Sequence, residues 1–94
     1  MKNGYIVNSR ECEVAGVDED RVMNLARKLS LLAIQAESMG LTIFGGAGHA
    51  DFRKRESTDG TGGALIVAQI LVGNWDGGDG GNCPDAQGLL RGES

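Results

Sequence analysis

The clearest pattern along the chain is a helical repeat of apolar residues between Asp18 and Gly40. Apolar side chains recur there at steps of three and four residues, which places them on one face of a helix. We expect Asp18 to cap the free amide groups of the first turn, and Gly40 to end the helix in a left-handed conformation. The apolar stripe consists of Val22, Leu25, Ala26, Leu29, Leu32, Ala33, Ala36 and Met39.

The same helix carries a second and narrower apolar strip. It is formed by Met23, Leu31 and Ile34 and is interrupted by Arg27. A helix on the surface of a monomer needs only one apolar face, so a second face favours a homo-oligomer that covers it. The alternative is that these are scattered surface residues, which are common on monomers.

Two later segments have the character of strands. Residues 41–44 are short, β-branched and bounded by glycines, which favours a strand. Residues 64–72 are apolar on both faces, with Gln69 as the only polar member, which is typical of a strand covered on both sides. Periodicity alone does not separate such a run from a buried helix. The long connection over residues 45–63 has room for a short strand around Phe52.

The two ends of the chain are weakly patterned. Residues 1–16 alternate apolar and polar side chains over short stretches and predict an N-terminal arm or an edge strand. Residues 82–94 follow a turn-rich region and predict a loose tail. We therefore predict a single small domain over residues 1–94 of the α+β class, with one long amphipathic helix packed on a small antiparallel sheet in (β)αββ order.

Composition narrows the class of protein. The 94 residues have a formal net charge of −4 and a pI near 4.8, which argues against a general nucleic-acid binder. Cys12 and Cys83 are too few for a disulfide framework, and both are expected to stay reduced. No segment has the apolar run of a signal peptide or a membrane span, so we expect a soluble cytoplasmic protein.

A glycine-rich loop followed by basic residues is the strongest candidate for a binding site. Glycines allow backbone amides to approach an anion closely, and guanidinium groups match phosphate geometry. The loop lacks the patterns of a phosphate-binding Walker loop and of a dinucleotide fingerprint. The alternative is a hairpin loop with a solvated charged tip. The candidate ligand-binding residues are Gly45, Gly46, Gly48, His49, Arg53 and Arg55, with Trp75 as a residue that stacks on a ligand ring or anchors the last strand.

A second glycine-rich segment, NWDGGDGG at residues 74–81, contains acidic residues. Asp76 and Asp79, with Asp85 beyond them, are oxygen donors of the kind that bind calcium, but the bidentate glutamate of an EF-hand is absent. Asp-Gly pairs are also favoured in tight turns. We therefore predict a structural loop without metal, and no cofactor.

His49 is the only histidine and the natural centre of any catalytic hypothesis. A Cys–His nucleophilic pair needs a third group to orient it, and no such group is evident from the sequence. One histidine and two cysteines do not complete a zinc site unless Asp51 or a second subunit supplies a further ligand. We predict a non-enzymatic protein, with a small enzyme that uses His49 as an alternative.

Two segments of the chain resemble a known group of proteins. AESMGLTIFGGAGH and NWDGGDGG are similar to segments of a family of short uncharacterised proteins from tailed phages and prophages, over roughly residues 18–81. The family offers no catalytic residues to transfer. The resemblance implies a phage setting, in which small proteins counter host defence by sequestering a signalling nucleotide or by blocking a defence protein such as a CRISPR effector.

Together these features predict a counter-defence binding protein in the host cytoplasm. It would sequester an anionic, nucleotide-like signalling ligand through the glycine loop and the basic residues. The alternative is a protein inhibitor, similar in role to an anti-CRISPR protein, that docks on a host defence complex through acidic residues such as Asp76 and Asp79.

Overall fold

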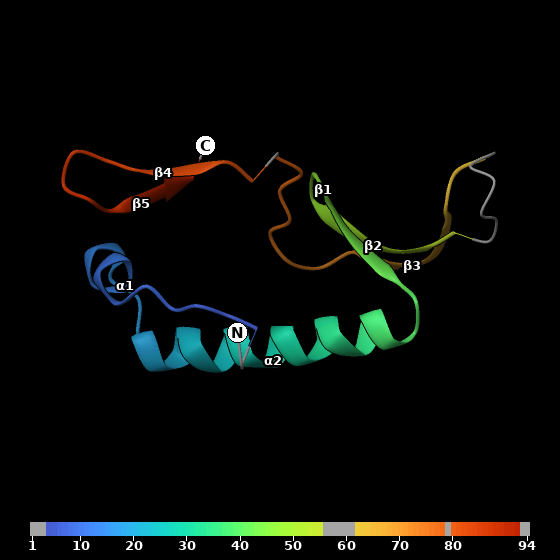
Figure 1. Ribbon diagram of the computed structural model, residues 1–94, viewed down its shortest axis with the longest axis horizontal. Coiled ribbons are helices and arrows are strands. Elements are labelled where there is room, and N and C mark those ends of the chain that lie inside the picture. The colour runs from blue at the N-terminus through green and yellow to red at the C-terminus, as the bar shows by residue number, and fades with distance from the viewer. Residues whose placement is uncertain (1–3, 56–61, 79, 93–94) are drawn as a thin grey trace. The chain divides into compact units, whose positions relative to one another are not determined.

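The computed structural model describes residues 4–55, 62–78 and 80–92. These residues confirm an α+β fold with small antiparallel sheets, shown in Figure 1. The predicted (β)αββ order was incomplete, because the described chain begins with two helices and continues with five strands. The elements are α1 (Ser9–Ala15), α2 (Glu19–Ser38), β1 (Thr42–Gly46), β2 (His49–Lys54), β3 (Leu65–Ile70), β4 (Asn82–Pro84) and β5 (Leu90–Gly92).

Helix α2 begins and ends where the sequence predicted. The Arg21 amide donates to Asp18 Oδ1 over 3.0 Å, which satisfies one free donor of the first turn. At the other end Gly40 has φ +74°. Its amide donates to the Glu37 carbonyl over 2.9 Å, and the Leu41 amide donates to the Ala36 carbonyl over 3.0 Å. These two bonds form a Schellman motif, which ends the helix.

Residues 9–15 form helix α1, so the prediction of an arm or edge strand was wrong for this segment. The alternation of Cys12 and Val14 with acidic residues was too short to distinguish the two-residue period of a strand from the 3.6-residue period of a helix. In the helix only Cys12 is buried, and Val14 is exposed. The missed signal was Gly16, whose φ of +73° ends the helix while its amide donates to the Glu13 carbonyl.

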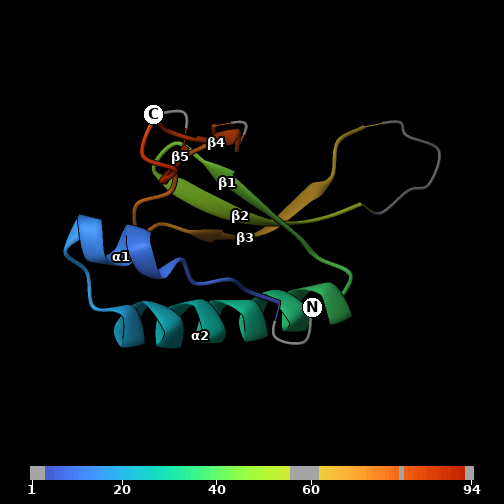
Figure 2. The ribbon, with the colours of Figure 1, turned by 60° about the vertical axis from the view of Figure 1, so that its left-hand side comes forward.

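Strands β1, β2 and β3 form an antiparallel sheet with β2 in the middle, as Figure 2 shows. The register of the pairing between β2 and β3 shifts by one residue between Phe52 and Arg53. The strand prediction within residues 64–72 is confirmed by β3. The expectation that it is covered on both sides is wrong for the single chain, because Leu65, Ile66 and Val67 are about half exposed. The physical reason is that β3 lies at the edge of the sheet.

Residues 82–92 form a β4–β5 hairpin, so the predicted loose tail was wrong over this stretch. Asp85 organises the turn. Its Oδ1 accepts hydrogen bonds from the amides of Gln87 and Leu89, and its Oδ2 accepts a hydrogen bond from Arg91 Nε over 2.8 Å. The hairpin is tied to α1 by the Leu90 amide, which donates to Glu11 Oε2 over 2.7 Å.

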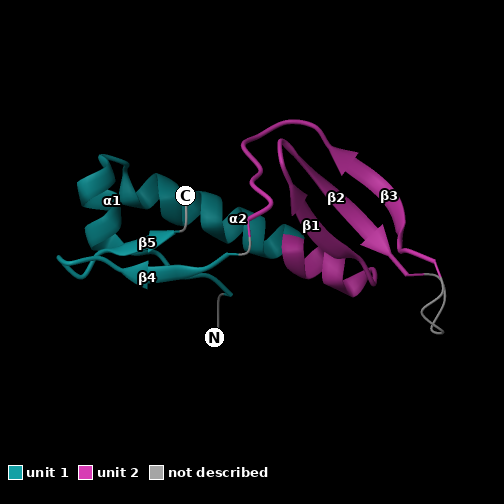
Figure 3. Cartoon of the chain, turned by 90° about the horizontal axis from the view of Figure 1, so that it is seen from above, with its two compact units in different colours: residues 1–32, 79–94 teal, residues 33–78 magenta. Residues whose placement is uncertain are grey.

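The chain divides into two compact units, residues 1–32 with 79–94 and residues 33–78, coloured separately in Figure 3. The buried apolar residues are Cys12 and Leu89 in the first unit, and Ala36 and Ala50 in the second. Each unit therefore has a small core. The single domain predicted over residues 1–94 stays a prediction. Neither α1 nor α2, within the described part of the chain, is long and apolar enough to cross a membrane.

The contact between α1 and the hairpin is expected to weaken in acid. The Leu90 amide that donates to Glu11 lowers the pKa of that carboxyl below its ordinary 4.5, and the Arg91 hydrogen bond lowers the pKa of Asp85 below its ordinary 3.8. Groups with lowered pKa stabilise the folded state above their ordinary pKa, and this stabilisation is lost as the pH falls through the folded value. The protection of the Leu90 amide against hydrogen exchange, relative to the rate of an unstructured amide at the same pH, should therefore fall below about pH 4.5.

The substitution Glu11→Gln should accelerate exchange of the Leu90 amide already at pH 7, because it removes the charged acceptor. Glu13→Gln, in the same helix, is the matched control and should leave it unchanged. Equal exchange in both variants at every pH would contradict the assigned contact.

Candidate functional site

One face of β2 collects three side chains that carry charge or chemistry. His49, Asp51 and Arg53 lie two residues apart along the strand, so their side chains share a face. Phe44 on β1 stands directly opposite Asp51. We call His49, Asp51, Arg53 and Phe44 the β2 cluster. Its residues all belong to the unit of residues 33–78.

The centre of the β2 cluster is Asp51, a buried acid. Only 1% of the residue is exposed, and a buried carboxylate is costly unless it is paired. Asp51 Oδ2 accepts from Arg53 Nη2 over 2.9 Å. This charge-assisted bond is of the strong kind, and it compensates the buried charge.

Two polar atoms of the same cluster are buried without a hydrogen-bond partner, Asp51 Oδ1 and Arg53 Nε. The His49 Nε2 atom lies 3.7 Å from Asp51 Oδ1, which is too long for a hydrogen bond. A small shift of the imidazole would satisfy the carboxylate. Buried polar groups without a partner are rare in native structures, and each calls for an explanation.

Arg53 is held from a second direction by an aromatic ring. Its guanidinium carbon lies 4.0 Å from the centroid of the Phe44 ring, which is a cation–π contact. About a third of the Arg53 side chain remains exposed. The guanidinium is therefore fixed in position and still reachable from solvent.

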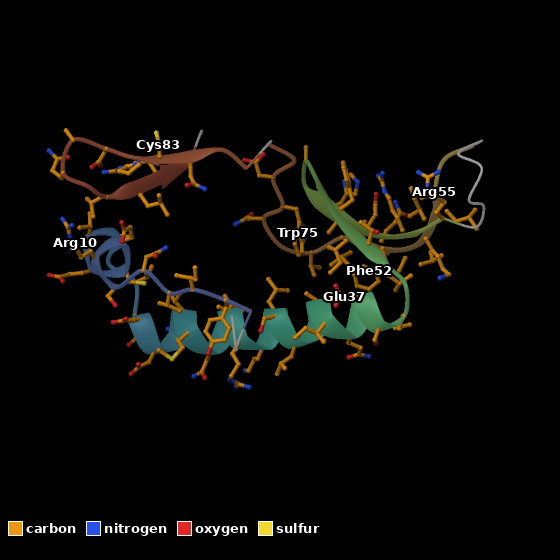
Figure 4. All side chains as sticks on the ribbon, in the orientation of Figure 1. Arg10, Glu37, Phe52, Arg55, Trp75 and Cys83 are labelled. Atoms are coloured by element: carbon orange, nitrogen blue, oxygen red, sulfur yellow. The ribbon has the colours of Figure 1, made fainter. Side chains whose placement is uncertain are left out.

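The three consecutive basic residues do not form one cluster. Lys54 Nζ lies over Gly40, 2.6 Å from where a Cβ would stand, at the end of α2 where a cation is favoured. Arg55 leaves the end of β2 (Figure 4) and donates to the Gly62 carbonyl over 3.5 Å, which is a weak bond. Of the predicted basic ligands, only Arg53 joins His49.

Two residues of the glycine loop, Gly46 and Gly48, have structural roles that the sequence did not predict. Gly48 has φ +84°, and its amide donates to the Trp75 carbonyl over 2.9 Å, so one amide expected to face an anion is used within the protein. Gly46 is buried against His49, whose Cε1 atom lies 3.0 Å from where a Cβ would stand. A side chain at Gly46 would displace the imidazole.

The two glycine-rich segments meet in the structure. A Cβ on Gly77 would stand 3.2 Å from the Gly45 carbonyl oxygen, which shows a close approach of two backbones. Asp76 Oδ1 accepts the Gly78 amide over 3.1 Å, which is an Asx turn. The structural role predicted for this loop is therefore supported at Asp76 and Gly77, while Asp79 lies outside the described residues.

Trp75 lies in the segment that follows β3. Its indole Nε1 donates to the Val72 carbonyl over 2.7 Å, and the ring packs on Gly73. Trp75 is thus tied to the end of the strand that precedes it, and the predicted anchoring of that strand to the helix stays a prediction. A role in stacking on a ligand stays a prediction.

Other candidate groups belong to the unit of residues 1–32 and 79–94. Cys12 is buried and Cys83 exposed, and both are free thiols. Asp85 is engaged by Arg91. Among the residues that the structure describes, no three His, Cys, Asp or Glu side chains are grouped to hold a metal ion. A groove of about 640 Å³ contains none of the predicted site residues and is lined by Gly16, Val17, Asp18, Arg21, Val22, Asn24, Leu25 and Lys28.

The sequence predicted His49 and Arg53 as site residues, named Asp51 only as a possible zinc ligand, and gave no role to Phe44. The available signal was the alternation His-x-Asp-x-Arg, which places three side chains on one face once residues 49–54 are a strand. The sequence predicted only a short strand around Phe52, so this alternation was not used.

Replacing Asp51 should cost stability through its partners. Asp51→Ala leaves the buried side of Arg53 without its acceptor, and we expect a loss of about 1–3 kcal/mol in the free energy of unfolding. Asp51→Asn keeps an acceptor and should lose less. Denaturant unfolding measures both, and Glu37→Ala on α2 is a control expected to stay within about 0.5 kcal/mol of the wild type. An Asp51→Ala variant as stable as Glu37→Ala would contradict the pairing.

Comparison of the chain with protein-family models, with curated proteins and with solved structures finds no match.

Proposed function

We propose that this protein binds an anionic, nucleotide-like ligand without catalysing a reaction, and that Arg53 and His49 of the β2 cluster contact the ligand. The observation that carries the proposal is the fixed position of Arg53 between the Asp51 carboxylate and the Phe44 ring. An arginine ordered before binding loses less conformational entropy when it meets an anion.

The chemistry of the neighbouring side chains supports a ligand with both charge and an aromatic ring. Guanidinium donors match phosphate and carboxylate oxygens. The Phe44 residue is 45% exposed and offers apolar surface beside the cation, where a nucleobase is able to stack. His49 keeps 40% of its side chain exposed and supplies a further ring nitrogen.

The charge of the site is modest, because Asp51 offsets Arg53. Discrimination between ligands would therefore depend on the positions of donors and rings more than on the strength of the local field. Arg55 lies beyond the β2 cluster and adds a cation at its margin. A phage setting, as implied by the resemblance to short phage proteins, fits sequestration of a signalling nucleotide.

Catalysis by His49 is the second candidate, and one observation favours it. Asp51 is the orienting carboxylate that the sequence did not identify, with its Oδ1 atom 3.7 Å from His49 Nε2. Pairs of this type activate a nucleophile or a water molecule. We rank binding first because the His49–Asp51 distance exceeds a hydrogen bond. A bound nucleotide recovered unchanged by chromatography after long incubation would support binding, and a hydrolysed one would support catalysis.

Arg53→Ala should weaken binding of cyclic and phosphorylated nucleotides by roughly 10–150-fold, because a charge-assisted hydrogen bond contributes about 1.5–3 kcal/mol. Arg53→Lys keeps the charge but loses the planar fork, and should recover only part of the affinity. Calorimetric titration measures each variant. Arg27→Ala on α2 removes the same charge elsewhere and should bind as the wild type does.

Gly46→Val should also reduce binding, because the new side chain would displace His49 while every charge is kept. If the wild type binds no nucleotide of the panel, and the Arg53 and Gly46 variants still protect a phage in an infected host, the ligand proposal fails and the protein-inhibitor alternative gains.

We also propose that α2 takes part in assembly of a homo-oligomer. The second apolar strip is exposed, with Met23, Leu31 and Ile34 between 41% and 55% accessible. Leu25, Leu29 and Leu32 of the main stripe are exposed by half or more as well. Exposed apolar area of this kind is typical of a surface that a partner covers.

Leu31→Glu should lower the molecular mass measured by sedimentation velocity, because it places an unpaired charge in the contact. Gln35→Glu adds the same charge on α2 without removing an apolar side chain and is the matched control. An equal mass for wild type and Leu31→Glu would contradict assembly through this strip.

A further inference from the structure

Strand β3 presents an open edge. It pairs with β2 on one side, and among the described residues no strand follows it on the other. The free side of such a strand carries a row of backbone donors and acceptors that fits another extended chain.

Two of the usual protections of an edge strand, charge and proline, are missing from β3, although its pairing with β2 is irregular at Val67, where the register shifts. Residues 65–72 contain no charged residue and no proline, and both keep edges from pairing. The opposite edge differs, because β1 ends in Gly45 and Gly46 and its Gly45 carbonyl is approached closely by Gly77. The sheet is therefore open to strand addition at β3.

We propose that β3 pairs with β3 of a second copy of this chain, in antiparallel orientation, to form a six-stranded sheet. Two features favour a second copy over an unrelated strand. The edge is uncharged, so two copies bring no like charges opposite each other. Antiparallel pairing of identical strands has two-fold symmetry and closes after two subunits, with the obstructed β1 edges outside.

The apolar composition of the strand is compatible with the same pairing. Residues 64–72 have the apolar pattern of a strand covered by protein, whereas in the single chain Leu65, Ile66 and Val67 are about half exposed, and Leu71 and Val72 about three-quarters exposed. A second copy at the edge gives these side chains apolar neighbours.

The size of the contact sets the expected affinity. Full burial of an aliphatic side chain removes roughly 60–120 Å² from water, so the exposed parts of these five side chains set an upper limit of roughly 400–700 Å² over two copies. The strand backbone adds to this. Interfaces below about 1,200 Å² are weak or transient, and we therefore expect a dimer that dissociates in the micromolar range.

The pairing has a consequence for the β2 cluster. A two-fold axis perpendicular to the sheet keeps both copies of the cluster on the same face. Three strand spacings separate the two β2 strands, which is about 14 Å. If the proposed function holds, this face offers two matching anion sites to one ligand or to two. The pairing itself does not depend on the proposed function.

Single cysteines along β3 test the pairing directly. Facing residues on antiparallel strands point to the same side, so under two-fold symmetry one interior residue must face its own copy. The Cα atoms of such a pair lie about 4.5–5.5 Å apart, which suits a disulfide. A residue two positions from this self-facing residue lies opposite a different residue of the partner strand. The two copies of that residue are about 13 Å apart along the strand direction.

The scan places one cysteine in turn at Ile66, Val67, Ala68 and Gln69 in a Cys12→Ala, Cys83→Ser background, followed by mild oxidation of ligand-free protein. We expect one position to give the most cross-linked dimer, at least tenfold more than the position two residues away. Thr42→Cys on β1 is the control and should cross-link no better than random collision. Circular dichroism confirms that each variant is folded.

Equal cross-linking at every β3 position, or none at protein concentrations of about 100 μM, would overturn the proposal. Adding Leu31→Glu separates the two contacts, because the β3 cross-link should persist when the helix contact is broken. A protein that cross-links through β3 but binds no nucleotide would refute the proposed function and leave the pairing intact.

Discussion

The carboxylate–guanidinium pair of Asp51 and Arg53 is the interaction on which the candidate site depends. A carboxylate with 1% exposure on the middle strand is tolerable only because Arg53 lies two residues along the same face and donates to it over 2.9 Å. The strand register also matters, because it sets Phe44 opposite Asp51. A slip of one residue in the register would turn the Asp51 side chain to the other face of the sheet. On that face Phe52 points towards the last turns of α2, which carry Glu37 (Figure 4).

The glycines near this pair act mainly by making room. Gly46 leaves space for the His49 ring, and Gly77 lets its backbone approach the Gly45 carbonyl. Gly48 takes a left-handed conformation and donates its amide to Trp75. The loop that had the composition of an anion nest is therefore largely a support for the end of the hairpin, while the charged side chains of the candidate site lie on β2.

The small core is the second constraint on this chain. Short chains bury a limited fraction of their surface, and here the buried apolar residues are only Cys12, Ala36, Ala50 and Leu89 in the described part. Large apolar side chains on α2 and β3 remain exposed. These exposed side chains lie in two places of different geometry, a strip along α2 and the edge strand β3.

Local interactions allowed the sequence alone to determine α2, with its Asp18 cap and Gly40 end, and the strand character of β1 and β3, because caps and β-branched runs act over a few residues. The rest required contacts between distant residues. The β4–β5 hairpin is held partly by Glu11, whose carboxylate accepts a hydrogen bond from the Leu90 amide 79 positions away in the sequence. Asp51 gained meaning only when strand pairing placed it beside Arg53, His49 and Phe44, because burial and register are properties of the folded sheet and not of any short segment.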